Sequence, residues 1–433
     1  MINIRKIVKK LIPKTLFKQI EPLGHLLEAV LMNIIYGFPS HKMHIIGVTG
    51  TNGKTTTTFL IQKMLHEAGF KVGMLSTVAY GMGDDIQDQY DHITTEQAGK
   101  LQRRLREFKQ AGVQWVVLES SSHSLAQYRT WGVRYEIAVM TNVTNDHLDY
   151  HGTFDNYLEA KRRLFKIAAR FGRKLGVVNA DDPNAEKFLA TTPRSISYGI
   201  GNGDLQAINL KLATDHSTYT AVDGDEKYNI RINIPGDFNV SNSLAAIAVG
   251  RELGLNREQI ETGIAALRGV EGRMTIVDEG QKFKVIVDFA GTPDAFERFF
   301  ESVRPLVKGK LIAVFGSAGR RDEVKRAVQG EIAGRYSDEV VLTEEDDRDV
   351  DGNEILAQIA SGAEQAGKVK DKDLFIVPDR EQAIRFAFGQ AKTADDAVVI
   401  LGKGHEKTLE RAKKVLDWSD IKVAEAELRS LHR

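Results

Sequence analysis

Hydrophobic residues occur along this chain in short runs that alternate with longer amphipathic stretches. From residue 43 onward the strand-like runs read HIIGVTG, KVGMLST, WVVLESSS, EIAVMTNV and LGVVNA. Helix-like stretches among them include TTTTFLIQKMLHEAG and LQRRLREFKQAG. Apolar runs that alternate with helices in this way are typical of a doubly wound, mostly parallel sheet. The pattern therefore predicts an α/β fold.

A second block with the same alternation begins near residue 270 and contains KFKVIVDF, KLIAVFG, EVVLT, LFIVP and AVVILG. It predicts a Rossmann-like α/β domain at the C-terminus. Shorter alternating segments within residues 195–235, such as STYTAV and KYNIRINI, predict antiparallel strands in or beside the first domain. We predict three parts, which are an N-terminal helical segment at residues 1–42, a central domain at 43–269 and a C-terminal domain at 270–433.

The first 42 residues combine basic and apolar positions. The basic residues of the first half are Arg5, Lys6, Lys9, Lys10, Lys14 and Lys18, and an apolar run over residues 26–36 follows them. A basic amphipathic helix of this kind binds anionic membrane surfaces, so residues 4–36 are a candidate for peripheral membrane contact. The alternative, which we favour, is a helix packed on the first domain with a solvated basic face.

The composition narrows the classes of function. The chain has 433 residues, no cysteine and a formal net charge of zero. Its length predicts two or three domains. A balanced charge argues against nucleic acid as the main partner, because phosphate binding normally needs a basic excess. Without cysteine the chain has neither disulfide nor thiolate, which fits a reducing cytoplasm and leaves oxygen and imidazole groups as metal ligands.

The strongest chemical signal is a glycine-rich loop between a strand-like run and a helix-like stretch. It consists of Gly50, Thr51, Asn52, Gly53, Lys54, Thr55 and Thr56. Backbone N–H groups of such a loop bind phosphate oxygens at a helix N-terminus, the lysine neutralises them, and the following hydroxyl ligates Mg²⁺. The two glycines are closer together than in the general GxxxxGK[ST] pattern, so TGTNGKTT is a subfamily form. The strand and helix around it disfavour an ordinary turn.

Polar residues that are candidates to hold the magnesium follow two later strand-like runs. Glu119 ends WVVLE, and the carboxyl end of a parallel strand is where open α/β sheets bind ligands. His147 lies in the polar segment TNVTNDHLDYHG after another apolar run. Alone, Glu119 also fits a solvated strand end and His147 a hydrogen-bonded loop residue. The spacing from His147 to Lys161 in YLEAKRRLF favours the metal role.

Eight separated motifs occur in the order seen in one known family. They are TGTNGKTT, ESSSHSL, TNVTNDHLDYHG, YLEAKRRLF, FNVSNSLAA, EGRM, VDFAGTPDA and LGKGHE, within residues 43–410. With these motifs the chain resembles the Mur ligases, in particular the MurE branch, which adds an amino acid to a UDP-N-acetylmuramoyl dipeptide. The resemblance implies a P-loop central domain, a C-terminal amino-acid-binding domain, and ATP-dependent amide synthesis through an acyl-phosphate in peptidoglycan precursor synthesis.

The resemblance also implies roles for individual residues. Lys54 matches a contact to the ATP phosphates, and Thr55 and Glu119 match the ligands of one Mg²⁺. His147 matches a ligand of a second Mg²⁺, and Lys161 matches a lysine that is carbamylated in the family. Further nucleotide-site matches are Asn239, Asn242, Arg273 and Asp288. Arg273 lies at the predicted domain boundary, where a guanidinium can stabilise phosphoryl charge on closure.

Two further groups of residues match substrate contacts of the MurE branch. Those for the peptidyl acceptor are Thr94, Thr95, Ser121, Gln127 and Arg129, and those for the amino acid are Arg321, Asp346, Arg348, Gly402 and Glu406. An asparagine usual before the paired threonines is Ile93 here. The Asp-Asn-Pro-Arg segment of diaminopimelate-adding enzymes reads Glu345-Asp346-Asp347-Arg348. The retained arginine favours meso-diaminopimelate, whereas the added acids leave lysine or ornithine open, and a solvated acidic loop is the ordinary alternative.

The chain departs from the family in two larger respects. Only 46 residues precede Gly47, so we expect the uridine-binding N-terminal domain of MurE enzymes to be absent, and Gly291 replaces a histidine that lines the nucleotide site. A relative that acts on a lipid-linked or other peptide is therefore one alternative. A non-catalytic nucleotide-binding protein and a folylpolyglutamate or cyanophycin-type ligase are the others. We predict a cytoplasmic enzyme, at the inner membrane surface if its acceptor is lipid-linked.

Overall fold

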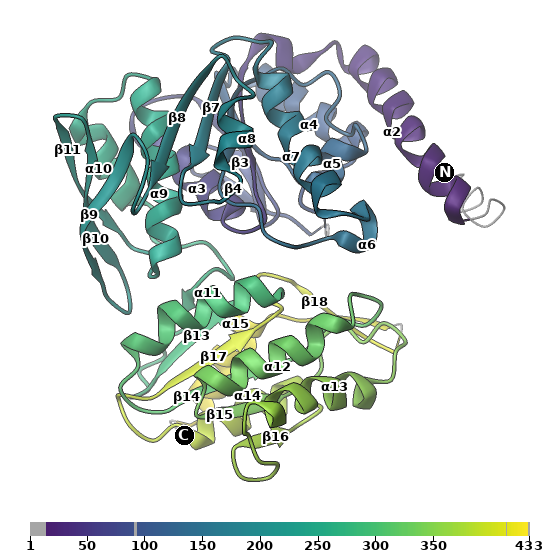
Figure 1. Cartoon of the computed structure of the whole chain (residues 1–433), viewed down its shortest axis with the longest axis vertical. Coiled ribbons are helices and arrows are strands. Elements are labelled where there is room, and N and C mark those ends of the chain that lie inside the picture. The colour runs from purple at the N-terminus through teal and green to yellow at the C-terminus, as the bar shows by residue number, and fades with distance from the viewer. Residues whose placement is uncertain (1–13, 91–92, 413, 432–433) are drawn as a thin grey trace. The chain divides into compact units, whose positions relative to one another are not determined.

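The structure, a computed structural model, describes residues 14–90, 93–412 and 414–431. Two compact units make up the chain (Figure 1). The first comprises Met1–Ile208, Thr220–Asn229 and Ser241–Ala266, and the second comprises Asn209–Tyr219, Ile230–Val240 and Leu267–Arg433.

Within the described residues the larger sheet has eleven strands, in the order β11-β10-β9-β8-β7-β6-β1-β5-β2-β3-β4. Its strands are β1 (His44–Thr49), β2 (Val72–Leu75), β3 (Ala79–Met82), β4 (Asp85–Asp88), β5 (Trp115–Glu119), β6 (Tyr135–Met140), β7 (Leu175–Asn179), β8 (Arg194–Gly199), β9 (Leu205–Leu212), β10 (Ser217–Asp223) and β11 (Glu226–Ile232). Strands β7, β6, β1, β5 and β2 pair in parallel, and β3 and β4 extend one edge as antiparallel strands.

Helices precede, connect and follow these strands in chain order. They are α2 (Lys14–Tyr36), η1 (Pro39–Lys42), α3 (Lys54–Glu67), α4 (Ala98–Gln110), α5 (Ser122–Ala126), α6 (Leu148–His151), α7 (Phe154–Ala168), α8 (Ala185–Leu189), α9 (Asp237–Glu252) and α10 (Arg257–Ala266). The alternation of buried parallel strands with helices confirms the predicted α/β fold.

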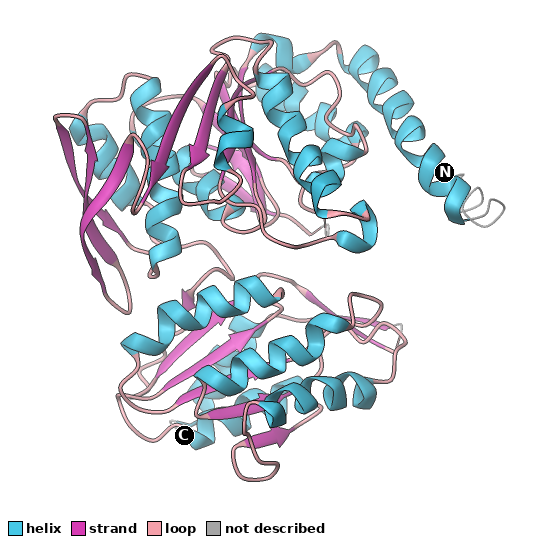
Figure 2. Ribbon diagram, viewed as in Figure 1, coloured by secondary structure: helices cyan, strands magenta, loops and turns pink. Residues whose placement is uncertain are grey.

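The smaller sheet has six strands in the order β12-β13-β17-β14-β15-β16, and a separate hairpin pairs β18 with β19. The strands are β12 (Thr275–Ile276), β13 (Lys284–Asp288), β14 (Leu311–Phe315), β15 (Glu339–Leu342), β16 (Leu374–Ile376), β17 (Ala397–Leu401), β18 (Thr408–Arg411) and β19 (Lys414–Asp417). The helices are α11 (Pro293–Val303), η2 (Arg304–Leu306), α12 (Val324–Tyr336), α13 (Gly352–Gln365), α14 (Arg380–Gln390) and α15 (Asp420–Leu431). Figure 2 shows helices around this sheet, whose β13 to β16 strands are parallel.

Strand β1 lies in the centre of the larger sheet, between β5 and β6. Its residues after His44 are buried, and Gly47 packs so closely that an added Cβ would lie 2.6 Å from Leu164 and 2.7 Å from Tyr135. A parallel sheet buried on both faces needs such continuous apolar strands. The carboxyl ends of β1, β5 and β6 therefore meet at one edge, where the glycine-rich loop, Glu119 and the segment 141–147 follow them.

Helix α2 packs along α4, and part of the predicted amphipathic segment falls within it. Arg5, Lys6, Lys9 and Lys10 lie outside the described residues. Ala29 and Asn33 are fully buried, whereas Leu27 is 71% exposed. The outward face of the described helix thus carries apolar side chains. No helix in the described part of the chain is long and apolar enough to span a bilayer.

A buried ion pair joins α14 to α15 in the second unit. Arg380 Nε and Nη2 donate to the two Asp420 oxygens at 2.7 and 2.8 Å, and neither side chain is exposed. We expect Asp420→Asn to lower the free energy of unfolding by about 3–5 kcal/mol, because it leaves the guanidinium buried without its counter-charge. Urea denaturation of the purified chain measures this. The matched control is Glu427→Gln, since its partner Arg385 is 57% exposed and the loss should be about 0–1 kcal/mol.

Candidate functional site

The glycine-rich loop lies between the end of β1 and the start of α3. Gly50 and Gly53 have φ angles of 155° and 81°. A Cβ on Gly50 would lie 1.8 Å from Thr141 Oγ1, and one on Gly53 would lie 2.2 Å from Asn242 Oδ1. Neither position has room for a side chain, so the backbone of the loop stays open to a ligand that approaches it closely.

The first turn of α3 presents a lysine and a hydroxyl at the loop. Lys54 Nζ donates to Thr51 O at 2.8 Å, which holds the ammonium back over the loop. Thr55 Oγ1 lies 3.1 and 3.2 Å from the two carboxylate oxygens of Glu119 and donates to them. Thr77 donates to the same carboxylate from its N–H and its hydroxyl, both at 2.9 Å. The loop, the helix start and the end of β5 therefore form one polar cluster.

The donor set at this cluster fits a magnesium ion. Glu119 is 1% exposed, yet among the described residues its carboxylate accepts hydrogen bonds only from neutral hydroxyl and amide groups. A buried carboxylate costs free energy unless hydrogen bonds or a cation compensate its charge. Carboxylate and hydroxyl oxygens are the ligands that Mg²⁺ prefers near a phosphate. Glu119 and Thr55 thus have the chemistry needed to hold the ion beside the loop.

Lys161 approaches the loop from α7. Its Nζ donates to Gly50 O, and it lies 4.4 Å from the centre of the Tyr157 ring, one turn earlier on the same helix. Tyr157 in turn bonds Thr51 Oγ1 through its hydroxyl at 2.9 Å. Burial lowers the pKa of Lys161 well below its usual range, and the charge of Lys54 lowers it further. The amine is therefore neutral far more often than an exposed lysine.

Three histidines gather beside Lys161. The His123 ring lies 4.6 Å from His147 and 5.4 Å from His151, measured between ring centres. Burial lowers the pKa of His123 and His147 to about 3 and that of His151 to about 4. Each imidazole is thus neutral at neutral pH and keeps a lone pair for a metal or a proton donor. His147 adopts a left-handed backbone with φ of 53°, which turns the chain into α6.

The acceptor residues predicted from the sequence fall partly together. Thr95 Oγ1 donates to Glu119 O at 2.9 Å and accepts from Ser121 N at 3.0 Å, and Arg129 Nη1 donates to Thr95 O. Ser121 caps α5, and Gln127 follows the end of that helix. Thr94 lies beside Thr95, with no side-chain hydrogen bond among those the described residues show. Thr95, Ser121 and Arg129 therefore form one network next to Glu119.

Two predicted nucleotide residues lie in the first turns of α9. Asn242 lies against Gly53 of the glycine-rich loop, and its Oδ1 accepts from Thr57 Oγ1 on α3 at 3.3 Å. Asn239 is buried, and its Nδ2 donates to Pro235 O at 2.7 Å. Asn242 thus belongs to the loop cluster, whereas Asn239 holds the turn that starts α9.

Arg273 and Asp288 lie together in the second unit. Arg273 Nη1 lies 3.1 Å from His405 Nδ1, and the guanidinium lies 4.5 Å from the Phe289 ring centre. Asp288 accepts from Met274 N and from the backbone of residue 290, each at 2.7 Å. Burial raises the pKa of Asp288, although Arg273 opposes this. The Phe289 ring thus orients the Arg273 guanidinium, whose charge acts on the buried Asp288 carboxyl.

Four of the five predicted amino-acid residues meet around a lysine that the sequence analysis did not select. Lys403 is fully buried and pairs with Asp346 at 2.8 Å and with Glu406 at 2.5 Å. Arg348 lies 3.8 Å from Asp346. Gly402, just before Lys403, has a φ of 105°. The fifth residue, Arg321, is exposed in the loop after β14, and no described contact joins it to this cluster.

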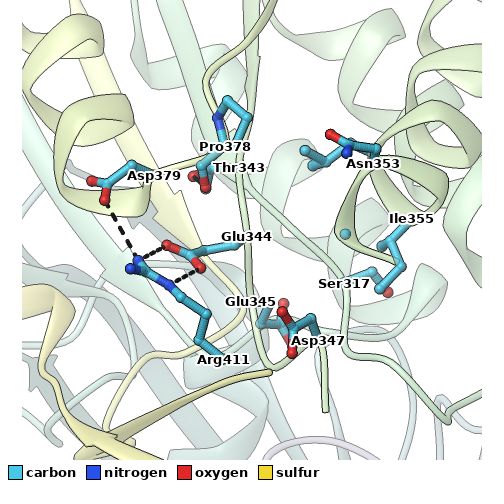
Figure 3. A pocket seen from close by; sticks show the side chains of 12 residues that line it. Ser317, Thr343, Glu344, Glu345, Asp347, Asn353, Ile355, Pro378, Asp379 and Arg411 are labelled. Atoms are coloured by element: carbon cyan, nitrogen blue, oxygen red, sulfur yellow. Dashed lines mark hydrogen bonds and ion pairs between the residues drawn. The ribbon is translucent and has the colours of Figure 1, made fainter. Parts of the chain in front are cut away.

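A cavity of about 370 Å³ adjoins this cluster in the second unit. Its lining residues are Ser317, Thr343, Glu344, Glu345, Asp347, Gly352, Asn353, Ile355, Leu356, Pro378, Asp379 and Arg411. Figure 3 shows Arg411 paired with Glu344 and with Asp379. Glu345 makes no hydrogen bond or ion pair among the described residues, and burial raises its pKa. The buried Ser317 hydroxyl also has no hydrogen-bond partner there.

The sequence analysis missed several residues at both clusters. Thr77 donates twice to Glu119, Tyr157 contacts Lys161, and Lys403 pairs with two acids. Tyr157 could have been predicted from the sequence, because it precedes Lys161 by four positions and residues at that spacing share one helix face. Lys403 lies within the LGKGHE motif that was already selected. Thr77 has no comparable signal, since only the fold brings it to Glu119.

Comparisons with known proteins agree with the motif order. The family model described as "Mur ligase middle domain" matches residues 48–250, and the one described as "Mur ligase, glutamate ligase domain" matches residues 272–404. The matched segments cover more than half of the chain and contain Lys54, Glu119 and Arg273.

Individual relatives are similar over most of their length. A UDP-N-acetylmuramyl-tripeptide synthetase of Roseiflexus sp. (strain RS-1) is 40% identical over 417 residues, which are 93% of this chain and 82% of the relative. A UDP-N-acetylmuramoyl-L-alanyl-D-glutamate--2,6-diaminopimelate ligase of Syntrophomonas wolfei is 40% identical over 403 residues, 93% of this chain and 81% of the relative. A solved structure of a ligase with that same name has a TM-score of 0.64 and 31% identity, and the match covers 90% of this chain and 79% of that one.

Proposed function

This chain belongs to the Mur ligase family of ATP-dependent amide-bond ligases, and on that premise we propose that it adds a diamino acid to a muramoyl-dipeptide acceptor in peptidoglycan precursor synthesis. The observation that carries the proposal is the loop cluster, in which Lys54, Thr55 and Glu119 meet. The loop beside them has no room for a side chain at Gly50 or Gly53. The domain limits at residues 1–42, 43–269 and 270–433 stay a prediction. The protein would act in the cytoplasm.

The reaction has two steps. The acceptor carboxylate attacks the γ-phosphorus of ATP, so that an acyl-phosphate forms and ADP leaves. The amine of the amino acid then attacks the acyl carbon, phosphate leaves, and the amine loses a proton. Lys54 would lie against the β- and γ-phosphate oxygens, as would the N–H groups of residues 50–56 at the start of α3. Bound at Thr55 and Glu119, Mg²⁺ would neutralise phosphate charge.

A second ion would be held by His147 and by Lys161 in its carbamylated form. His147 supports this because its imidazole is neutral at neutral pH, as a metal ligand requires. Lys161 supports it because carbamylation is attack of a neutral amine on CO₂, and burial lowers the pKa of this amine. Carbamylation gives Lys161 a negative charge, which attracts the Lys54 ammonium and does not repel it. Arg273, Asp288, Asn239 and Asn242 would complete the nucleotide site.

The acceptor would bind at Thr94, Thr95, Ser121, Gln127 and Arg129. The supporting observation is that Thr95, Ser121 and Arg129 are already joined by hydrogen bonds beside the backbone of Glu119. An acceptor bound there would approach the magnesium site at Thr55 and Glu119 from the carboxyl end of β5. A lipid-linked acceptor is the second candidate, and contact of residues 4–36 with a membrane would favour it.

For the amino acid we propose meso-diaminopimelate before lysine. The distal end of diaminopimelate carries both an ammonium and a carboxylate, whereas that of lysine carries only an ammonium. Arg348 offers a cation for the carboxylate, and the acidic cavity wall at Glu345 and Asp347 offers acceptors for the ammonium. Gly402, Glu406, Arg321 and Asp346 would frame the rest of the amino acid.

A substrate matrix tests the proposal. UDP-linked and lipid-linked muramoyl dipeptides are combined with diaminopimelate, lysine or ornithine, and both phosphate release and product mass are measured. We expect turnover with the UDP-linked dipeptide and diaminopimelate. Lack of turnover with every muramoyl acceptor would defeat the proposal. ATP binding without any ligation would instead favour a non-catalytic relative, and glutamyl extension of a folate would favour a folylpolyglutamate-type ligase.

Arg348 provides a sharper test of the amino-acid site. We expect Arg348→Ala to lower kcat/KM for diaminopimelate by about 10–100-fold, because a charge-assisted contact worth about 1.5–3 kcal/mol is lost. The value for lysine should stay within about twofold of the unmodified enzyme, since lysine has no distal carboxylate. Equal losses for both amino acids would mean that Arg348 holds the loop and does not select the substrate. Arg320→Ala is the matched control, because that arginine lies on the surface and pairs with Asp349.

A further inference from the structure

Helix α2 exposes a row of large apolar side chains to solvent. They are Leu23, Leu27, Leu31, Ile34 and Ile35, and each is between 52% and 71% exposed. Residues at this spacing share one face of an α-helix. Single exposed leucines are ordinary on protein surfaces, but a contiguous apolar row marks a surface that contacts something apolar.

The opposite face of α2 packs against the rest of the first unit, so the helix cannot rotate to bury the apolar row without losing that packing. Ala29 and Asn33 are fully buried. Asn33 Nδ2 donates to Ala29 O at 2.8 Å and to Trp131 O at 2.7 Å. On α4, a Cβ added to Gly99 would lie 3.4 Å from the Met32 sulfur, which shows how closely the two helices pack. The apolar row therefore faces outward by the geometry of this packing.

The charge of residues 1–20, which extend into the start of α2, indicates which kind of apolar surface the row binds. Residues 1–20 contain Arg5, Lys6, Lys9, Lys10, Lys14 and Lys18, and no aspartate or glutamate. Basic residues next to an apolar helical face are the combination that binds anionic lipid, where each basic residue near the surface adds about 1 kcal/mol. The same charges would repel those of a second copy of this chain.

We propose that α2 lays its apolar row on the surface of an anionic bilayer, to which the positive charge of residues 1–20 adds attraction. This gives the membrane contact of residues 4–36 a defined helix face and a lipid charge, and it does not depend on amide synthesis or on the choice of amino acid. The apolar row would contact the acyl region just beneath the lipid headgroups.

The test is sedimentation of the full-length chain with vesicles. One set contains phosphatidylglycerol and phosphatidylcholine, and the other contains phosphatidylcholine alone. We expect binding to the anionic vesicles, weaker binding to the neutral ones, and release at high salt. The double variant Leu27→Glu/Leu31→Glu should bind the anionic vesicles at least about tenfold more weakly, because two leucines leave the acyl region and two anions are added.

A matched control separates the apolar row from a general charge effect. Val369→Glu/Val415→Glu makes the same charge change at two valines that are 51% and 66% exposed in the second unit, and its vesicle binding should be unchanged. Stabilisation by ATP and magnesium, read as a shift in Tm, confirms that each variant is folded. Equal binding of both double variants, or no binding by the unmodified chain, overturns the proposal. So does a dimer in light scattering that only Leu27→Glu/Leu31→Glu dissociates, since the row would then join two copies.

Discussion

Lys54→Ala is expected to lower kcat for amide synthesis by about 100–1,000-fold, the usual cost of removing one group that stabilises developing charge. Lys54 Nζ lies over the glycine-rich loop, bonded to Thr51 O at 2.8 Å, and no other ammonium in the described cluster shares that place. Lys161 is directed at Gly50 O instead. Steady-state ADP release measures kcat, and nucleotide affinity from equilibrium titration shows whether binding or transfer is lost.

The control for Lys54 lies on the same helix. Lys63 pairs with Glu67 at 2.7 Å and with Asp84 at 2.9 Å, away from the loop. Lys63→Ala should therefore keep kcat within about twofold of the unmodified enzyme. If Lys54→Ala retained a similar kcat while its Tm was unchanged, the loop would not be the site of phosphoryl transfer.

Much of the fold follows from local patterns. The buried strands β1, β5, β6 and β7 coincide with apolar runs that are too short for helices, and the glycines of the loop indicate where a side chain has no room. The carboxyl ends of adjacent parallel strands then bring Glu119 to the loop, as the sheet topology requires. These features depend on spacing along the chain and on a general rule of sheet geometry.

Other features depend on contacts that spacing does not contain. The sequence did not show which way the apolar run of residues 26–36 faces, and the described part of α2 turns Leu27 and Leu31 outward. Asn33 accounts for this orientation, because its amide hydrogen-bonds two carbonyls and so occupies the buried side. The predicted basic face involves residues 5–18, whose side chains lie outside the described part, and stays a prediction. Similarly, the fully buried Lys403 pairs with Glu406 three residues later and with Asp346 on a distant segment of the chain. Only tertiary structure brings Asp346 to this lysine.

Lys161 is the second residue whose loss should have a large effect. We expect Lys161→Ala to lower kcat by about 100–1,000-fold, because the site loses the anion that would hold a second metal. Lys161→Arg should be equally inactive, since a guanidinium keeps its charge and does not react with CO₂. Lys166→Ala is the matched control on α7, because Lys166 is 48% exposed and pairs with Glu159 at the surface. Its kcat should stay within about twofold.

The pH dependence of Lys161 distinguishes carbamylation from a purely structural role. The pKa of this amine is lowered by burial first and by the charge of Lys54 second, so the reactive neutral form is present at lower pH than for an exposed lysine. Lowering the pH protonates the amine, so we expect the carbamylated fraction of Lys161 to fall as the pH decreases. Bicarbonate added at higher pH, where more of the amine is neutral, should restore that fraction. Mass spectrometry under non-denaturing conditions detects the CO₂ adduct, and kcat should follow its occupancy. A kcat that is independent of bicarbonate, with no adduct at any pH, would leave Lys161 as a cation whose bond to Gly50 O supports the loop.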